Sequence, residues 1–230
     1  MQNSFKPFIK MKELIEISSE LTGKIKASCL LFRGLNCQEY NPNLWYEIQK
    51  IIEEYQSKFG EPAEATQILK PARDLYRAIG MEPTRNRPSS EALLRRILQR
   101  KELYQINSLV DASNFCSLKF LLPIGLYDFQ KISGQIELRR GREGEEYQGI
   151  RKDMIHVNDR FTLADGKGPF GNPSADSLRT AVNLETESIL FVIFAPYSYA
   201  EETLKTHAGI ASKFILSHHN GEMVSNVVAS

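Results

Sequence analysis

The spacing of apolar residues changes along the chain, and this change constrains the fold more than any other feature of the sequence. Over 44–59, 71–79 and 89–98, apolar residues recur every three or four positions, as in amphipathic helices. Residues 135–139 instead alternate between polar and apolar, and 189–194 is a continuous run of aliphatic and aromatic residues, as in strands. Helices mostly in the first half and a mixed or antiparallel sheet mostly in the second predict an α+β fold.

Weaker patterns complete the expected order of elements. Residues 26–32 fit a strand, 108–120 fit a helix less clearly, and 154–163 leave room for another strand. Residues 166–173 combine three glycines with two prolines, which predicts a compact loop of forced turns. A last helix is expected over 199–218, just before an Asn-Gly pair that would end it.

The length of 230 residues permits one large domain or two small ones. The sequence shows no internal repeat and no low-complexity tract. We therefore expect a single domain over 1–230. Within it, 1–65 is interpreted as an N-terminal strand–helix extension packed on the rest, and 199–220 as a C-terminal helix.

Charge and cysteine content exclude several classes of protein. Lys and Arg number 29 against 28 Asp and Glu, so the net charge of +1 excludes a histone-like arm or an acidic tail. Cys29, Cys37 and Cys116 cannot build a disulfide framework and indicate a reducing compartment. The longest apolar run, 189–196, is much shorter than the ~18 residues of a membrane helix. Because the N-terminus also lacks a signal-peptide pattern, we expect a cytoplasmic protein with no membrane partner.

The common motifs of nucleotide, metal and hydrolase chemistry are missing from the sequence. The glycines at 166 and 168 do not have the spacing of a phosphate-binding loop. There is no H-E-x-x-H motif, no Cys/His pair with zinc spacing and no G-x-S-x-G elbow. We expect no cofactor, no bound metal and no ATP, and we interpret the four histidines as structural.

The densest basic cluster lies on and just after the expected helix at 89–98, and two interpretations stay open. The cluster is a solvated helix face, or it contacts RNA, because phosphate contacts need clustered Arg and Lys rather than overall basicity. Its members are Arg87, Arg95, Arg96, Arg100 and Lys101.

The same helix carries two local predictions. Ser89 or Ser90 is expected to cap its first turn. Glu91 is expected to form an exposed, structural ion pair with an arginine, with Arg95 one turn away as the first choice.

Several short motifs follow one another in the middle of the chain. N-S-L-V-D-A-S-N-F at 107–115 and P-I-G-L-Y-D at 123–128 resemble the V-V-D-x-T-N-Y … P-x-H-A-F-D segment of one family. That family is the B3/B4 editing domain of the bacterial phenylalanyl-tRNA synthetase beta subunit. The segments 134–145 and 185–191 are similar to its G-x-I-x-V-R strand, R-E-G-E turn and E-T-x-x-V-L-L element. R-P-S-S-E-A-L-L-R-R at 87–96 resembles the opening of stand-alone proteins built on this domain, and the resemblance covers roughly 70–195.

The resemblance implies an α+β domain with a pocket that, in the synthetase, receives a mischarged tyrosyl-tRNA and hydrolyses it. The synthetase motifs for ATP and tRNA charging have no counterpart here, so the chain is not expected to aminoacylate tRNA. Gly125 and the segment 176–179 should lie on one cavity. The ligand-binding residues implied by the matching segments are Asn107, Asp111, Asn114, Pro123, Gly125, Asp176 and Arg179. For Asp111 and its asparagine neighbours, satisfying backbone groups is the competing interpretation.

Two departures from the family pattern affect the expected chemistry. The family histidine in P-x-H-A-F-D falls on Gly125. The glutamate that ends the family's Gly-Gly-x-x-Gly-Gly-Glu run is absent, with Leu178 nearest in alignment and Asp176 the closest carboxylate. Catalytic residues are therefore not assigned, and two functions stay open. One is hydrolysis in trans of a mischarged aminoacyl-tRNA or a related aminoacyl ester, and the other is non-catalytic binding of an amino-acid-like ligand or RNA in the same pocket.

Overall fold

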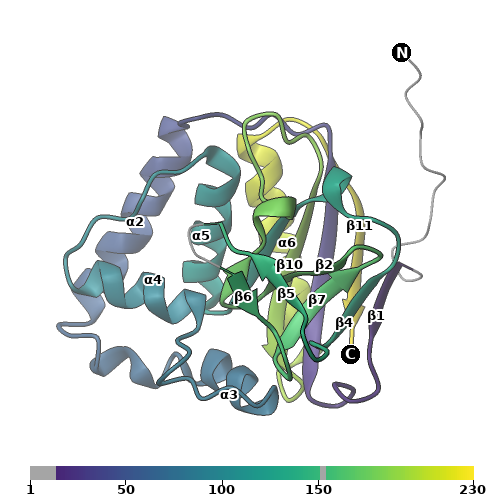
Figure 1. Cartoon of the computed structure of the whole chain (residues 1–230). Helices are drawn as coiled ribbons and strands as arrows, with labels where there is room; N and C mark the ends of the chain where they lie inside the picture. Colours follow the sequence, from purple (N-terminus) through teal and green to yellow (C-terminus); the bar gives the residue numbers. More distant parts are fainter. Residues whose placement is uncertain (1–13, 151–153) are drawn as a thin grey trace.

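The computed structural model describes residues 14–150 and 154–230, and its strands form two main sheets (Figure 1). The central sheet is antiparallel, in the order β11–β2–β10–β3. The second sheet, in the order β1–β4–β7–β8–β9, is antiparallel except for the β1–β4 pair. Strands β5 and β6 form a small ribbon. The strand bounds are β1 Ile15–Ile17, β2 Ile25–Arg33, β3 Ile124–Asp128, β4 Ile136–Arg140, β5 Glu146–Gln148, β6 Met154–His156, β7 Phe161–Asp165, β8 Gly168–Asn172, β9 Ala175–Asp176, β10 Ile189–Pro196 and β11 Glu222–Ala229.

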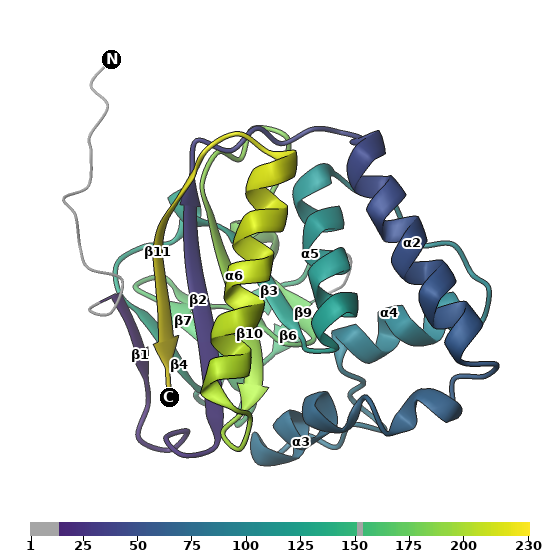
Figure 2. The same ribbon diagram turned by 180° about the vertical axis from the view of Figure 1, so that it is seen from behind.

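Helices α2, α4, α5 and α6 pack on one side of the central sheet, whereas α3 contributes Leu75 and Tyr76 to the apolar cluster on the other side. Figure 2 shows α6 and α5 over this sheet, with α2 farther out. The α-helices are α2 Pro42–Lys58, α3 Lys70–Ala78, α4 Ser89–Leu98, α5 Ser108–Phe120 and α6 Glu201–His218, and short 3₁₀ turns are η1 Glu64–Thr66, η2 Phe129–Lys131 and η3 Leu178–Thr180. The α+β prediction is confirmed.

The position of β10 in the fold explains why its sequence is apolar at every position. Ile189, Phe191 and Ile193 face the helices and belong to the larger core cluster. Leu190 and Val192 point to the opposite face and pack in a second cluster with residues of the other sheet. All eight residues of β10 are buried, because the central sheet lies between a layer of helices and a second sheet.

Local signals determine where the two longest helices of the first half begin. The Asn41 side chain accepts a hydrogen bond from the Leu44 N–H at 3.1 Å, and Pro42 occupies the first turn of α2. The Asn107 side chain caps α5 in the same way, accepting from the Val110 N–H at 3.0 Å. Helix α5 ends where Leu121 adopts a left-handed conformation, with φ of 55°.

Two local predictions are wrong. The segment 166–173 is not a loop, because most of it forms β8, which pairs with both β7 and β9. The register is irregular between Leu163 and Ala164, beside Pro169, where a proline cannot donate to the ladder. Helix α4 has Pro88 at its N-cap, and the hydroxyls of Ser89 and Ser90, both inside the helix, make no cap.

The segment expected to be an N-terminal extension contributes to the centre of the molecule. Strand β2 pairs with both β10 and β11, so it is an interior strand of the central sheet. Strand β11 follows α6 and was not expected from the sequence. No helix in the two described ranges is long and apolar enough to cross a membrane.

Candidate functional site

A buried polar cluster lies between β3 and the β8–β9 hairpin. Tyr127 on β3 is completely buried, and its ring passes between two glycines. A Cβ atom added at Gly125 or at Gly171 would lie 2.5 Å from the Tyr127 hydroxyl oxygen. Asp176 on β9 pairs directly with Gly171 in the sheet. The fold therefore brings a phenol and a carboxylic acid from distant segments to one place.

Neither of these two polar groups is satisfied in the ordinary way. The Tyr127 hydroxyl and the Asp176 Oδ1 are both inaccessible to solvent, and neither has a hydrogen-bond partner of standard geometry within the described ranges. Burial raises the pKa of Asp176 to about 7. Burial, followed by the nearby Asp176 charge, raises the pKa of Tyr127 well above its usual value of 10. The two groups also act on each other, since the Tyr127 hydroxyl lowers the pKa of Asp176 in opposition to the larger effect of burial. Buried polar groups with shifted pKa values are enriched at functional sites.

Two more tyrosines enclose the β8–β9 turn. The Tyr147 hydroxyl donates to the Ala175 carbonyl at 2.6 Å and accepts from the Asn172 amide at 3.0 Å. The Tyr76 hydroxyl donates to the Pro173 carbonyl at 3.0 Å. Burial raises the pKa of both phenols, and the Asp176 charge adds to this effect. These tyrosines remain protonated and hold the hairpin that presents Asp176.

Sequence reasoning missed the tyrosines of this cluster. One signal was present: Tyr127 stands where the family pattern P-x-H-A-F-D has phenylalanine, so this chain has a hydroxyl that the pattern lacks. Tyr76 and Tyr147 gave no comparable signal, because their positions depend on how distant segments pack.

Asn107 and Asp111, at the start of α5, have structural roles. Asn107 is the helix cap described above. Asp111 accepts hydrogen bonds from the Trp45 indole N–H at 2.7 Å and from the Ile106 N–H at 3.3 Å. Burial raises the pKa of Asp111. Asn114 is half-buried on the same helix. Asn107 and Asp111 therefore satisfy a helix end and an indole, which agrees with the competing interpretation of this motif.

Pro123 and Arg179 have structural roles outside the polar cluster. The Pro123 carbonyl accepts from the Phe194 N–H at 3.0 Å, which fixes the start of β3. The Arg179 guanidinium donates to both oxygens of Asp165 at 2.9 Å. It also donates to the Lys131 carbonyl at 3.2 Å. Arg179 thus fastens η3 to β7, and Leu178 beside it is exposed.

Glu91 is at the centre of a buried charge cluster. Its carboxylate accepts from Arg73 at 2.8 and 2.7 Å and from Arg95 at 2.7 Å. Arg87 lies 3.9 Å away. The predicted Glu91–Arg95 pair is confirmed, but its expected exposure is wrong, because Glu91 is only 1% exposed. Burial alone would raise the pKa of Glu91, but the bonds from Arg73 and Arg95 outweigh it and lower that pKa.

The basic cluster divides into two groups. Arg87 and Arg95 surround Glu91, as described above. Arg96 stacks over the Tyr104 ring at 4.1 Å from its centroid. The Arg100 guanidinium donates to the Gln56 side chain at 2.6 Å, and Lys101 is exposed.

Two members of the second group, Arg100 and Lys101, line a groove between α2 and the segment 100–105. The groove has a volume of about 600 Å³, and its walls include Gln56, Arg100, Lys101 and Tyr104. Tyr104 is 57% exposed. Within the described ranges, no group of three or more His, Cys, Asp or Glu side chains could hold a metal ion.

The close contact between Gly125 and Tyr127 gives a testable prediction. We expect Gly125→Ala to destabilise the fold by about 1–3 kcal/mol, since the new methyl group overpacks the Tyr127 ring. Urea denaturation measures this change in the free energy of unfolding. Gly134→Ala is not a suitable control because its φ is +76°, so the matched control is Gly209→Ala, where a Cβ meets nothing within 4 Å. Equal stability of the Gly125 and Gly209 variants would contradict the described packing.

Comparisons with known proteins agree on one family. A family model described as the B3/4 domain matches residues 71–213. A phenylalanine–tRNA ligase beta subunit from Neisseria meningitidis serogroup A is 26% identical over 203 residues, covering 82% of this chain and 24% of the relative. Its counterpart from serogroup B is 30% identical over 112 residues, covering 47% and 14%. The chain thus spans about a quarter or less of the length of these relatives.

One solved structure also shows a likeness. It is an N-terminal fragment of the phenylalanyl-tRNA synthetase beta subunit from Pyrococcus horikoshii, with 14% sequence identity and a TM-score of 0.43. The match covers 94% of this chain and 50% of that fragment.

Proposed function

This chain belongs to the B3/4 domain family, and from that premise we propose that it hydrolyses mischarged aminoacyl-tRNA, or a related aminoacyl ester, in trans. It is a relative of the synthetase editing domain and would not itself aminoacylate tRNA. The observation that supports hydrolysis is the buried Asp176 carboxyl, whose pKa of about 7 suits a general base at neutral pH.

Ester hydrolysis needs a base that takes a proton from water. In the proposed reaction, the Asp176 carboxylate removes a proton from a water molecule while the water oxygen bonds to the ester carbon. The Tyr127 hydroxyl is inaccessible to solvent beside this carboxyl, so its proposed role is to position the base rather than to contact the ester. The carbon–oxygen bond to the ribose then breaks, and the proton held by Asp176 passes to the leaving oxygen. The products are a free amino acid and uncharged tRNA.

We interpret the two departures from the family pattern, the missing histidine and the missing glutamate, as one linked change. Where the pattern has histidine and phenylalanine, this chain has Gly125 and Tyr127, and the Tyr127 hydroxyl fills the space beside Gly125. The lost glutamate has a substitute in Asp176, whose carboxyl Oδ1 is buried near the same hydroxyl. We retain Gly125 and Asp176 as site residues. Asn107, Asp111, Pro123 and Arg179 support the surrounding structure, and Asn114 lies half-buried on α5.

The direct test is release of the amino acid from charged tRNA. Purified chain is incubated with tyrosyl-tRNA and with a panel of other aminoacyl-tRNAs, and release is compared with spontaneous hydrolysis. Acceleration for at least one member supports the proposal. If the chain binds an aminoacyl-adenosine analogue but accelerates none of the esters, the non-catalytic ligand-binding function is the correct one.

The groove beside α2 is the proposed position for the RNA. Arg100 and Lys101 would contact phosphates, and the exposed Tyr104 ring, already stacked with Arg96, would accept a base. Glu53 and Glu102 also line this groove, so the phosphate contacts would come from Arg100 and Lys101 individually rather than from a uniformly basic surface.

Salt dependence tests this RNA surface. Binding of uncharged tRNA should weaken with salt, and the double change Arg100→Glu and Lys101→Glu should flatten the log–log slope by about 1.4–1.8, as expected for two lost phosphate contacts. Lys213→Glu on α6 is the matched control and should leave the slope unchanged. No binding at low salt, or equal slopes for all variants, would remove this surface from the proposal.

A further inference from the structure

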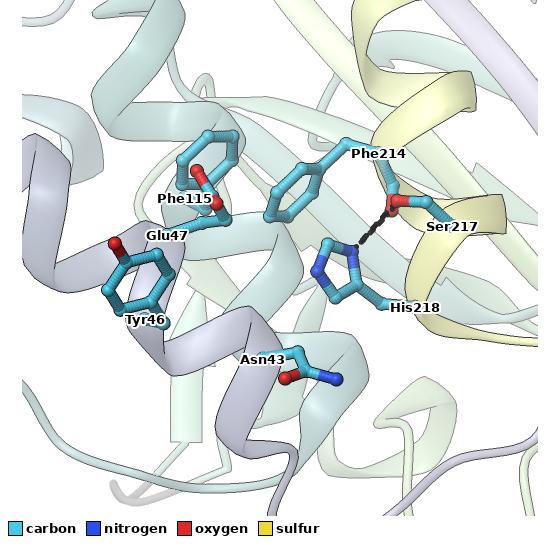
Figure 3. A pocket seen from close by; sticks show the side chains of 7 residues that line it. All are labelled: Asn43, Tyr46, Glu47, Phe115, Phe214, Ser217 and His218. Atoms are coloured by element: carbon cyan, nitrogen blue, oxygen red, sulfur yellow. Dashed lines mark hydrogen bonds between the residues drawn. The ribbon is translucent and has the colours of Figure 1, made fainter.

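Besides the groove described above, a hollow lies between the start of α2 and the end of α6 (Figure 3). Its volume of about 480 Å³ is within the range of small-ligand sites. Tyr46 and Glu47 come from α2, Phe115 from α5, and Phe214 and His218 from α6. None of the residues that line it is Lys or Arg.

Aromatic rings form much of this hollow. Phe115 and Phe214 stack with centroids 3.8 Å apart, and the His218 ring lies 4.5 Å from Phe214. Tyr46 is 64% exposed. Aromatic faces attract organic cations, so a ring-lined hollow with a carboxylate favours a positively charged guest.

His218 and Glu47 contribute polar groups to the hollow. The His218 Nδ1 lies 2.9 Å from the Phe214 carbonyl. A carbonyl only accepts, so Nδ1 is the donor in this bond, and Nε2 is the second ring nitrogen. In Figure 3 this second ring nitrogen faces away from Ser217, toward Tyr46. Glu47 adds a carboxylate that is 38% exposed.

The ammonium group of Lys50 already contacts Tyr46 and Glu47, two of the residues that line the hollow. It lies 5.0 Å from the Tyr46 ring centroid and 3.2 Å from both oxygens of Glu47. Lys50 itself does not line the hollow. The positive N-terminal end of α2 and the negative C-terminal end of α6 both lie at this hollow, so their electrostatic effects on a bound ion offset each other. The Glu47 carboxylate therefore determines the sign of the charge that the hollow attracts.

We propose that this hollow binds an organic cation, an alkylammonium group on an apolar stem. The ammonium pairs with Glu47 and lies over Tyr46, competing with Lys50, while the stem covers the half-buried Phe214. The guest is a free amine or a lysine side chain of a polypeptide, since both present the same group.

The test compares a charged probe with a neutral one of similar shape. Butylammonium and 1-butanol are titrated separately into the intact chain, and the ring resonances of Tyr46 and His218 are followed by NMR. A blocked Gly-Lys-Gly peptide forms a third arm, which distinguishes a free amine from a lysine side chain. Butylammonium should bind more tightly than butanol. Equal binding of the two, or no binding of either amine probe, would overturn the proposal.

Three variants assign the site. Glu47→Gln should weaken butylammonium binding by about fivefold, as expected for loss of a partly exposed charge pair. Lys50→Met should strengthen it, because the internal competitor is removed. Glu54→Gln, an exposed carboxylate on the same helix, is the matched control and should change nothing. If Glu47→Gln behaves like Glu54→Gln, or if Lys50→Met binds no more tightly than the unaltered chain, the assignment is wrong.

Discussion

Replacing Asp176 with asparagine should reduce ester hydrolysis by about 10²–10⁴-fold, the contribution expected of a positioned general base. The amide has nearly the same shape, so the loss would report the missing base rather than a changed fold. The rate of amino acid release measures the effect. For the unaltered chain, the rate should rise with pH through about 7, since only the ionised carboxylate accepts a proton.

The same substitution should stabilise the protein above neutral pH. The pKa of Asp176 is raised in the folded chain from 3.8 to about 7, so the folded state binds the proton more tightly than the unfolded state. Stability therefore falls as pH rises from about 4 to 7, and the full cost of the buried charge is present above that range. Asp176→Asn removes this cost and should gain on the order of 2–4 kcal/mol at pH 8.

Asp165→Asn provides the contrasting variant for these measurements. It removes the carboxylate that holds Arg179, and so should lower stability at pH 8 instead of raising it. Opposite signs for the two variants would support a functional role for Asp176. Full hydrolytic activity in Asp176→Asn would exclude it as the base.

Replacing Glu91 with glutamine should cost about 3–5 kcal/mol of folding free energy at pH 7. The change leaves Arg73 and Arg95 close together without the carboxylate that both contact. Urea denaturation across pH measures this cost. Because the pKa of Glu91 is lowered on folding from 4.5, its stabilisation is present above that pH and is lost as pH falls through the folded pKa. The difference between variant and parent should therefore shrink in acid.

Asp74→Asn is the matched control for Glu91. Asp74 also contacts two cations, Lys70 and Arg77, but its side chain is 30% exposed, so the loss should stay below about 1 kcal/mol. Similar losses for the two variants would show that the Glu91 cluster behaves as a surface network rather than a buried one.

Prediction from the sequence succeeded where the governing interactions are local. The apolar periodicity of α2 acts within one or two turns, so the helix could be placed from its own residues, two positions after its actual start at Pro42. Strand β10 was evident because burial on both faces leaves no polar position. Strand β8 was not predicted, because Pro169 and Gly171 are residues typical of turns, and only pairing with β7 and β9 makes this segment a strand.

The sequence by itself determined the α+β class, the family resemblance and the absence of the family's histidine and glutamate. Only the tertiary structure showed that Tyr127 lies beside Asp176, the two residues that we propose take their place. Tyr127 and Asp176 belong to different strands, and no local pattern indicates that they meet. The pKa of Asp176 depends on burial by neighbours distant in sequence. Helix periodicity is a property of adjacent turns, whereas strand pairing and desolvation are properties of the assembled fold.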